Sequence, residues 1–247
     1  MKPVITFENM QLFSYTNSRL ITGKPGGIVI SFFGLGCTDI YDTDTEEGKF
    51  FAGHNFLYLV PYTNPWGWMN DDEAKLTDEL VRVLCKHYGE DLRVASTGGS
   101  MGGMAALTYC CKASKTPAVC VANCPVCDFP YHYGERDDLP RTIYSALYRQ
   151  ADGDIDNLKA AMTALSPLHL ASSMPDIPYY IFHCTDDRAV NKKMHSDRFV
   201  EAMNNSGHKQ NMHYTAVDGR GHCDLGEQYT DYLNAVLTVL GGNKTEN

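Results

Sequence analysis

The stretch Ser96-Thr97-Gly98-Gly99-Ser100-Met101-Gly102-Gly103 decides the interpretation of this chain. A β-rich run over residues 92–96 leads into it, and a helix-favouring run over 104–113 follows it. A serine on a sharp turn between strand and helix needs small residues two positions before and after it, because larger side chains would collide there. Gly98 and Gly102 meet that requirement and complete the pattern G-x-S-x-G, which is typical of a serine nucleophile.

The position of Ser100 at the start of a helix suits it to chemistry, because backbone N–H groups and the helix dipole favour a developing negative charge there. A glycine-rich turn with an incidental serine is the simpler alternative. A phosphate-binding loop is a third, but the chain has neither a G-K-[ST] ending nor G-x-G-x-x-G at this place. The flanking strand and helix favour a nucleophile at Ser100.

The composition suits a globular enzyme. With 247 residues, 43% hydrophobic and 21% charged, the chain is expected to form one α/β domain over residues 1–247. A net charge of -9 and a pI near 5.4 weigh against nucleic acid or an anionic membrane as partners. The N-terminus lacks the apolar core of a signal peptide, and no run approaches the roughly 20 apolar residues of a membrane span. These features predict a cytoplasmic protein.

The chain has nine cysteines. Cys124-Pro125-Val126-Cys127 is a lone C-x-x-C, whereas a zinc site of this type needs a second pair. We therefore predict no metal and no cofactor, and we expect reduced, largely buried thiols.

Strands are predicted to alternate with helices along most of the chain, which indicates a mostly parallel sheet with helices on both faces. Short antiparallel strands are predicted over 3–8, 10–15 and 18–22, and buried strands over 27–33, 56–61, 92–96, 118–124, 178–184 and 210–217. Helices are predicted over 71–88, 104–113, 141–150, 155–164, 191–205 and 227–240. Residues 39–48 are predicted to be an acidic loop, and about 125–177 a small helical cap inserted over the sheet.

A serine nucleophile needs a histidine base and an acid that orients the histidine. In enzymes with this turn the order is serine, acid, histidine, with each in a loop after a strand. The predicted strand 178–184 runs into Thr185-Asp186-Asp187-Arg188, and the strand 210–217 into Asp218-Gly219-Arg220-Gly221-His222. Both partners are therefore present in the required order.

On these residues the chain resembles the α/β-hydrolase superfamily, and within it the prolyl-oligopeptidase-like group of esterases and peptidases, over about residues 27–240. The segment 183–190 is similar to that group's H-G-x-x-D-x-x-V, with Cys184 in place of the glycine, and 219–222 is similar to its G-x-G-H. The resemblance implies an α/β-hydrolase fold and a triad of Ser100, Asp187 and His222. Asp186 is then expected to hold the turn.

The resemblance also implies an oxyanion hole. Its first half comes from the loop after the strand 27–33, where Phe33-Gly34-Leu35-Gly36 lacks the histidine that many relatives carry. Because the hole uses backbone N–H groups, that loss need not matter. The expected donors are Leu35 and Met101, with Gly34 as the alternative to Leu35.

Aromatic residues are expected near the active face. Trp66 and Trp68, together with Tyr131 and Tyr133, are predicted to form a wall for an apolar or ring-shaped group, unless the tryptophans only pack their loop onto the domain. The acids Glu135, Asp137 and Asp138 are expected either to meet a substrate amine or, more simply, to face water.

These residues predict a serine hydrolase that cleaves small carboxylic esters through an acyl-enzyme on Ser100. A peptidase acting on short peptides is the alternative. Only about 26 residues precede the strand 27–33, whereas larger peptidases of the group carry an N-terminal propeller, which weighs against it. A non-catalytic binding protein of this fold would usually lose a triad member. The expected partner is a small ester or short peptide, and the oligomeric state stays open.

Overall fold

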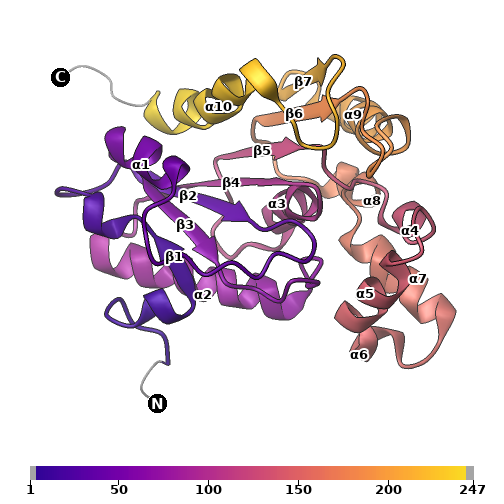
Figure 1. Ribbon diagram of the computed structural model, residues 1–247, viewed down its shortest axis with the longest axis horizontal. Helices are drawn as coiled ribbons and strands as arrows, with labels where there is room; N and C mark the ends of the chain where they lie inside the picture. The colour runs from indigo at the N-terminus through magenta and orange to yellow at the C-terminus, as the bar shows by residue number, and fades with distance from the viewer. Residues whose placement is uncertain (1–3, 243–247) are drawn as a thin grey trace.

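The computed structural model describes residues 4–242 and contains one seven-stranded sheet (Figure 1). The strand order is β1-β3-β2-β4-β5-β6-β7; only β1 is antiparallel to its neighbour, and the other pairs are parallel. This confirms the predicted mostly parallel sheet. The strands are β1 (Ser14–Thr16), β2 (Gly27–Phe32), β3 (Leu57–Pro61), β4 (Arg93–Gly99), β5 (Val119–Asn123), β6 (Tyr179–Cys184) and β7 (Met212–Val217).

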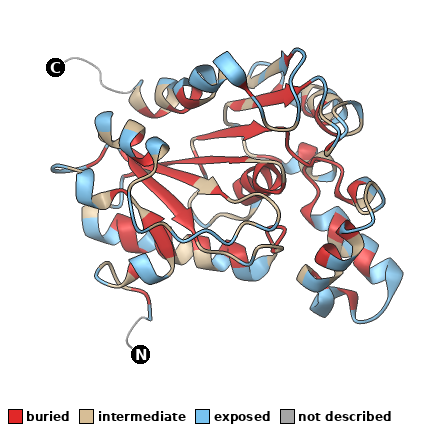
Figure 2. Cartoon of the chain, viewed as in Figure 1, coloured by how far each residue is buried: buried red, intermediate tan, exposed pale blue. Residues whose placement is uncertain are grey.

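Helices cover both faces of the sheet. Alternate residues of β2 point to opposite sides: Ile28 and Ile30 join one buried cluster and Val29 another. The first cluster includes side chains of α2 (Asp71–Tyr88), α3 (Met101–Lys112) and α9 (Arg198–Met203). The second includes side chains of α1 (Glu46–Gly53) and α10 (Tyr229–Gly241). Figure 2 shows the resulting pattern, with buried strands and helices exposed on their outer sides.

A helical insertion, residues 125–177, separates β5 from β6. It contains α4 (Phe129–His132), α5 (Leu139–Ala146), α6 (Tyr148–Ala151), α7 (Ile155–Leu165) and α8 (Pro167–Leu170). Figure 1 shows α4 to α7 gathered to one side of the sheet. Its buried side chains form a third cluster with Trp68, Met101 and Met104, so the insertion packs against the start of α3.

The predicted N-terminal strands are mostly wrong. Only Ser14–Thr16 is a strand; Met10–Leu12 and Ser18–Leu20 are 3-10 turns, and no strand forms over 4–8, residue 3 lying outside the described residues. Side-chain hydrogen bonds replace ladder pairing here. Asn17 Nδ2 donates to the Gly48 and Phe56 carbonyls, and its Oδ1 accepts from the Tyr58 N–H.

Three further boundaries differ from prediction. The predicted acidic loop over 39–48 ends in α1, because Thr45 caps the helix by accepting from the Gly48 N–H at 2.9 Å. Helix α3 begins at Met101 rather than 104, directly after the serine. The predicted helix over 191–205 is α-helical only at Arg198–Met203, with π-type turns on either side. Among residues 4–242, no helix has the length and apolar character needed to cross a membrane.

Candidate active site

Ser100 occupies a strained turn between β4 and α3. Its φ of 58° and ψ of -124° lie outside the regions that non-glycine residues favour. A Cβ on Gly98 would lie 2.3 Å from the Gly102 carbonyl oxygen, and one on Gly102 would lie 2.2 Å from the Phe32 carbonyl oxygen. Both obstacles are backbone atoms that no rotamer change can remove. The turn therefore requires glycine at both positions, as G-x-S-x-G demands.

Asp187 and His222 are joined across the loops that follow β6 and β7. His222 Nδ1 donates to Asp187 Oδ2 at 2.7 Å, and the Asp187 side chain has no exposed area. Asp187 Oδ1 accepts from the N–H groups of Ala189 at 2.8 Å and Val190 at 3.0 Å. Asp186, by contrast, is exposed, and its carboxylate contacts the Thr185 hydroxyl at 3.5 Å.

The charges of this pair support each other. Burial opposes ionisation of Asp187, but hydrogen bonds from His183, His222 and the Val190 N–H outweigh it and hold the pKa of the carboxyl far below its usual range. Burial likewise opposes charging of His222, yet Asp187, with a smaller contribution from Cys124, raises the pKa of the imidazole to about 9. The carboxylate thus stabilises the imidazolium that a general base becomes.

His183 contacts the Asp187 carboxylate and the loop that carries it. It is fully buried; Nε2 lies 3.1 Å from the Val190 carbonyl oxygen and 3.3 Å from Asp187 Oδ2. Because a carbonyl can only accept, Nε2 carries the proton, and Nδ1 accepts from the Ser196 hydroxyl at 2.7 Å. His183 therefore holds the Asp187 loop in place.

The end of β5 ties the serine turn to the histidine loop. The Ser100 N–H donates to the Asn123 carbonyl at 2.9 Å, and Asn123 Nδ2 donates to the Cys223 carbonyl at 3.1 Å. Ser100, Asp187 and His222 thus follow the carboxyl ends of β4, β6 and β7, on either side of β5. The structure brings the three predicted residues to one edge of the sheet.

The two predicted oxyanion donors have free N–H groups. Within residues 4–242, neither Leu35 nor Met101 donates a backbone hydrogen bond. Met101 is the first residue of α3, where an N–H has no partner inside the helix. The Leu35 loop is held by the Gly36 N–H, which donates to the Pro65 carbonyl at 2.8 Å. Both groups remain candidate donors to an oxyanion.

The four predicted aromatic residues have different surroundings. Trp68 is 1% exposed, and its Nε1–H donates to Thr142 Oγ1 at 3.3 Å. Trp68 thus packs its loop onto the domain, which is the second of the two roles considered for it. Trp66 is half-buried, with the Arg141 guanidinium 5.3 Å from its ring centre. Tyr131 is 38% exposed and Tyr133 half-buried, so these two and Trp66 remain accessible.

Glu135 is occupied by two histidines and is not free to meet a substrate amine. Its Oε2 accepts from His132 Nδ1 at 2.5 Å and from His195 Nε2 at 2.8 Å. Burial opposes its ionisation, but these bonds lower the pKa of the carboxyl to about 2. Asp138 pairs with Arg136 at 2.8 Å, so two of the three acids considered for an amine are already paired.

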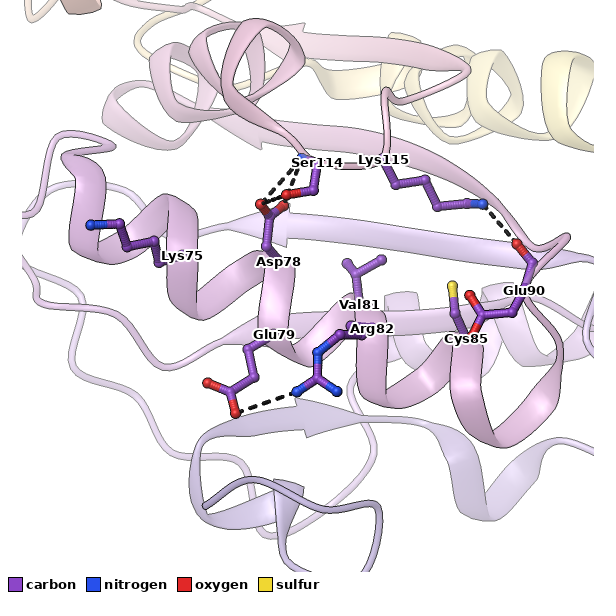
Figure 3. Close-up of a pocket in the computed structure, with 9 residues that line it drawn as sticks. All are labelled: Lys75, Asp78, Glu79, Val81, Arg82, Cys85, Glu90, Ser114 and Lys115. Atoms are coloured by element: carbon purple, nitrogen blue, oxygen red, sulfur yellow. Dashed lines mark hydrogen bonds and ion pairs between the residues drawn. The ribbon is translucent and has the colours of Figure 1, made fainter. Parts of the chain in front are cut away.

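A surface hollow lined by residues other than those of the serine turn is also present. It has a volume of about 530 Å³ and is formed by α2 and residues 90 and 114–115 (Figure 3). Asp78 accepts from the Ser114 N–H and hydroxyl, and Lys115 Nζ donates to the Glu90 carbonyl. These contacts fasten the turn after α3 to α2, which is a structural role.

Solved structures with the same fold are α/β-hydrolases. A puromycin-hydrolyzing peptidase of Mycobacterium tuberculosis superposes with a TM-score of 0.70 at 17% identity, covering 92% of this chain and 35% of that one. Esterase 2 of Thermogutta terrifontis gives 0.65 at 17% identity, covering 94% and 89%. A putative dipeptidyl aminopeptidase IV of Bacteroides ovatus gives 0.67 at 14% identity, covering 89% and 32%.

The chain thus has the α/β-hydrolase fold. The prolyl oligopeptidase family model matches residues 67–238, and the chain belongs to that family. It spans about a third of the length of the peptidases named above and most of the length of the esterase. No curated protein matches it significantly in sequence. The solved structures to which the chain is similar include both esterases and peptidases.

Proposed function

We propose that this protein is a serine hydrolase that cleaves small carboxylic esters through an acyl-enzyme on Ser100. The observation that carries the proposal is the 2.7 Å hydrogen bond between His222 and the fully buried side chain of Asp187. Asn123 ties the His222 loop to the strained serine turn. This arrangement supplies a nucleophile, a base of fixed tautomer and an acid that stays ionised.

The reaction follows from these positions. Ser100 Oγ attacks the ester carbonyl while His222 Nε2 takes the hydroxyl proton, and Asp187 stabilises the resulting imidazolium. The N–H groups of Leu35 and Met101 donate to the oxyanion of the tetrahedral intermediate. The intermediate collapses, the alcohol leaves with the proton from His222, and water repeats the sequence to release the acid.

One observation favours an ester over a peptide. Oε2 of Glu135 is held by His132 and His195, so this carboxylate is already engaged within the protein and is less suited to pair with a substrate amine. A peptidase acting on short peptides is the second candidate, supported by family membership.

Labelling and turnover test the proposal together. A fluorophosphonate should modify the wild-type chain once, at Ser100, and p-nitrophenyl acetate or butyrate should be cleaved faster than aminoacyl anilides. Ser100→Ala should lose both labelling and turnover. Ser172→Ala, at an exposed serine, is the matched control and should retain both. Stoichiometric labelling of Ser100→Ala would refute the nucleophile, and preferred cleavage of the anilides would favour the peptidase.

A further inference from the structure

Thiols that the proposed reaction does not use surround His222. Cys124 directly follows β5, and Cys223 follows His222 in the loop after β7. Cys124 Sγ, Cys223 Sγ and a ring nitrogen of His222 all lie within 4.8 Å of one another. Cys127, the partner of Cys124 in the C-x-x-C motif, is instead buried with its Sγ toward the Pro125 carbonyl. The cluster is therefore assembled by the fold and not by the motif.

The spacing of these atoms fits a tetrahedral metal ion. With Zn–S near 2.3 Å and Zn–N near 2.0–2.1 Å, tetrahedral angles separate sulfur from nitrogen by about 3.6 Å and two sulfurs by about 3.8 Å. His222 Nε2 lies 3.7 Å from Cys223 Sγ. The nitrogen and sulfur thus stand at the separation that zinc requires, before any rearrangement.

The tautomer of His222 also suits a metal ligand. Nδ1 donates its proton to Asp187, so Nε2 of the neutral ring carries the lone pair, and Cys223 Sγ lies 3.7 Å from it. A carboxylate that accepts from the second ring nitrogen is the usual outer support of a zinc-bound histidine, because it fixes the ring and raises its basicity. Asp187 has that position here.

Two other groups of possible metal ligands have donor atoms within the same distance of one another, one around His195 and one around His183. In neither of these two histidines is a ring nitrogen free to bind a metal ion. His195 Nδ1 accepts from the Cys127 and Asp128 N–H groups, so its Nε2 carries a proton that points at Glu135. Both ring nitrogens of His183 are bonded, to the Ser196 hydroxyl and the Val190 carbonyl. Neither His195 nor His183 therefore offers a lone pair to a metal ion, whereas Nε2 of the neutral His222 ring does.

The backbone at both cysteines is strained. Cys124 has φ 44° and Cys223 φ 60°, in the left-handed region that residues other than glycine and asparagine rarely adopt. Such strain persists only where surrounding contacts impose it, and it concentrates at functional sites. Here it occurs at the two residues that place sulfur beside the catalytic histidine.

We infer that Cys124, His222 and Cys223 bind a zinc ion that reversibly inhibits the enzyme. Each cysteine binds as the thiolate, any proton it carries passes to solvent as its Zn–S bond forms, and the ion takes the Nε2 lone pair of His222. His222 then has no lone pair with which to accept the Ser100 proton, so acylation stops. The inference rests on the proposed serine hydrolase function, because inhibition acts through the same histidine.

Cadmium binding can be measured by absorbance and does not depend on enzyme activity. Titrating the wild-type chain, reduced with a non-thiol reductant, should give an ultraviolet cadmium–thiolate charge-transfer band that saturates at one ion per chain. Cys124→Ser and Cys223→Ser should each lose at least half of that band. Cys111→Ser removes an exposed cysteine on α3 and should leave the band unchanged.

Zinc inhibition gives the second measurement, with each variant compared with its own rate in EDTA. Wild type and Cys111→Ser should be inhibited by zinc and recover in EDTA. Cys124→Ser and Cys223→Ser should need at least tenfold more zinc for half-inhibition. In the wild-type chain, zinc should also protect Cys124 and Cys223 from alkylation by iodoacetamide, as measured by mass spectrometry. This measurement needs no variant, so it holds even if a cysteine variant does not fold.

The outcomes separate the two proposals. A chain that cleaves esters but gives no cadmium band and no zinc protection would overturn the metal site and leave the hydrolase standing. A chain that binds cadmium at one site but cleaves no ester would overturn the proposed function and the inhibitory role with it, and would leave the metal site standing. Equal zinc inhibition in all four proteins would show that zinc acts elsewhere.

Discussion

Asp187 and Asp186 are adjacent in the chain, yet only Asp187 is buried and bonded to His222. Because the carboxylate holds the histidine tautomer and stabilises the imidazolium, Asp187→Asn should lower kcat about 10,000-fold without unfolding the chain. Asp186→Asn should cost far less, since its carboxylate contacts only the Thr185 hydroxyl among the described residues. Ester turnover of both variants, with circular dichroism to verify folding, checks this. A larger loss in well-folded Asp186→Asn would reverse the assignment.

The pH dependence of turnover follows from His222. The base accepts a proton only when neutral, and the pKa of His222 is raised to about 9. We expect kcat/KM to rise with pH between 7 and about 9, measured in EDTA. Cys124→Ser should move the midpoint to lower pH, because hydrogen bonding and charge at Cys124 contribute to the raised pKa. A profile that is flat above pH 6.5 would contradict this prediction.

At the scale of elements, the junction of β4 and α3 depends on two glycines. Gly98→Ala and Gly102→Ala place a methyl group against the carbonyls of Gly102 and Phe32, so overpacking should destabilise the fold by about 1–3 kcal/mol. The displaced turn should also cost ester turnover. Gly53→Ala, at the end of α1, meets no atom within 4 Å and is the control. Thermal melts that do not distinguish the three variants would refute the steric explanation.

Helix α2 carries a buried carboxyl in its first turn. Burial raises the pKa of Glu73 to about 7, and its Oε1 has no hydrogen-bond partner in the described part of the chain. Because the folded state binds this proton more tightly than the unfolded state, the folded state is stabilised below about pH 4.5, and that stabilisation is lost as pH rises through about 7. The shift in pKa corresponds to roughly 3 kcal/mol in the free energy of unfolding.

Glu73→Gln keeps an acceptor for the Met69 N–H, which donates to Glu73 Oε2 at 2.8 Å, and removes the ionisation. The melting temperature of Glu73→Gln should therefore exceed that of wild type by more at pH 8 than at pH 5. Glu79→Gln, on the same helix and half-exposed, should show no such difference between the two pH values. The same result for both variants would exclude burial as the cause.

At the scale of the whole molecule, we expect the helical insertion to favour short acyl groups in the proposed ester substrate. Its apolar side chains are used in packing: Trp68 lies 5.0 Å from Phe129, ring centre to ring centre, and the cluster extends to Met104 of α3. Trp66 and Tyr131 remain partly accessible, which suits a compact or planar group. We expect C2 and C4 p-nitrophenyl esters to be cleaved faster than C12 and C16 esters, by kcat/KM below micelle formation. The reverse order would contradict this.

The sequence alone determined the features that local pattern controls. Gly98 predicts the turn locally, because a Cβ there would meet the backbone of Gly102, four positions along the chain. A Cβ on Gly102 would instead meet Phe32 of β2, which is distant in the sequence. The alternation of apolar strands and helices predicts the parallel sheet, because strand and helix periods differ. Resemblance over 183–190 selected Asp187 over Asp186, and the hydrogen bond to His222 agrees with that choice.

Only the tertiary structure decided which distant groups meet. Trp68 and Trp66 share a loop, but the insertion that buries Trp68 lies more than 50 residues further along the chain. The N-terminal segment alternates polar and apolar residues as strands do. The Asn17 side chain, however, forms hydrogen bonds with backbone groups more than 30 positions away in the chain. Cys124 and Cys223 are separated by 99 residues and meet at His222 because β5, β6 and β7 are neighbours in the sheet. Strand order is a property of the whole sheet, and the residue pattern within one strand does not encode it.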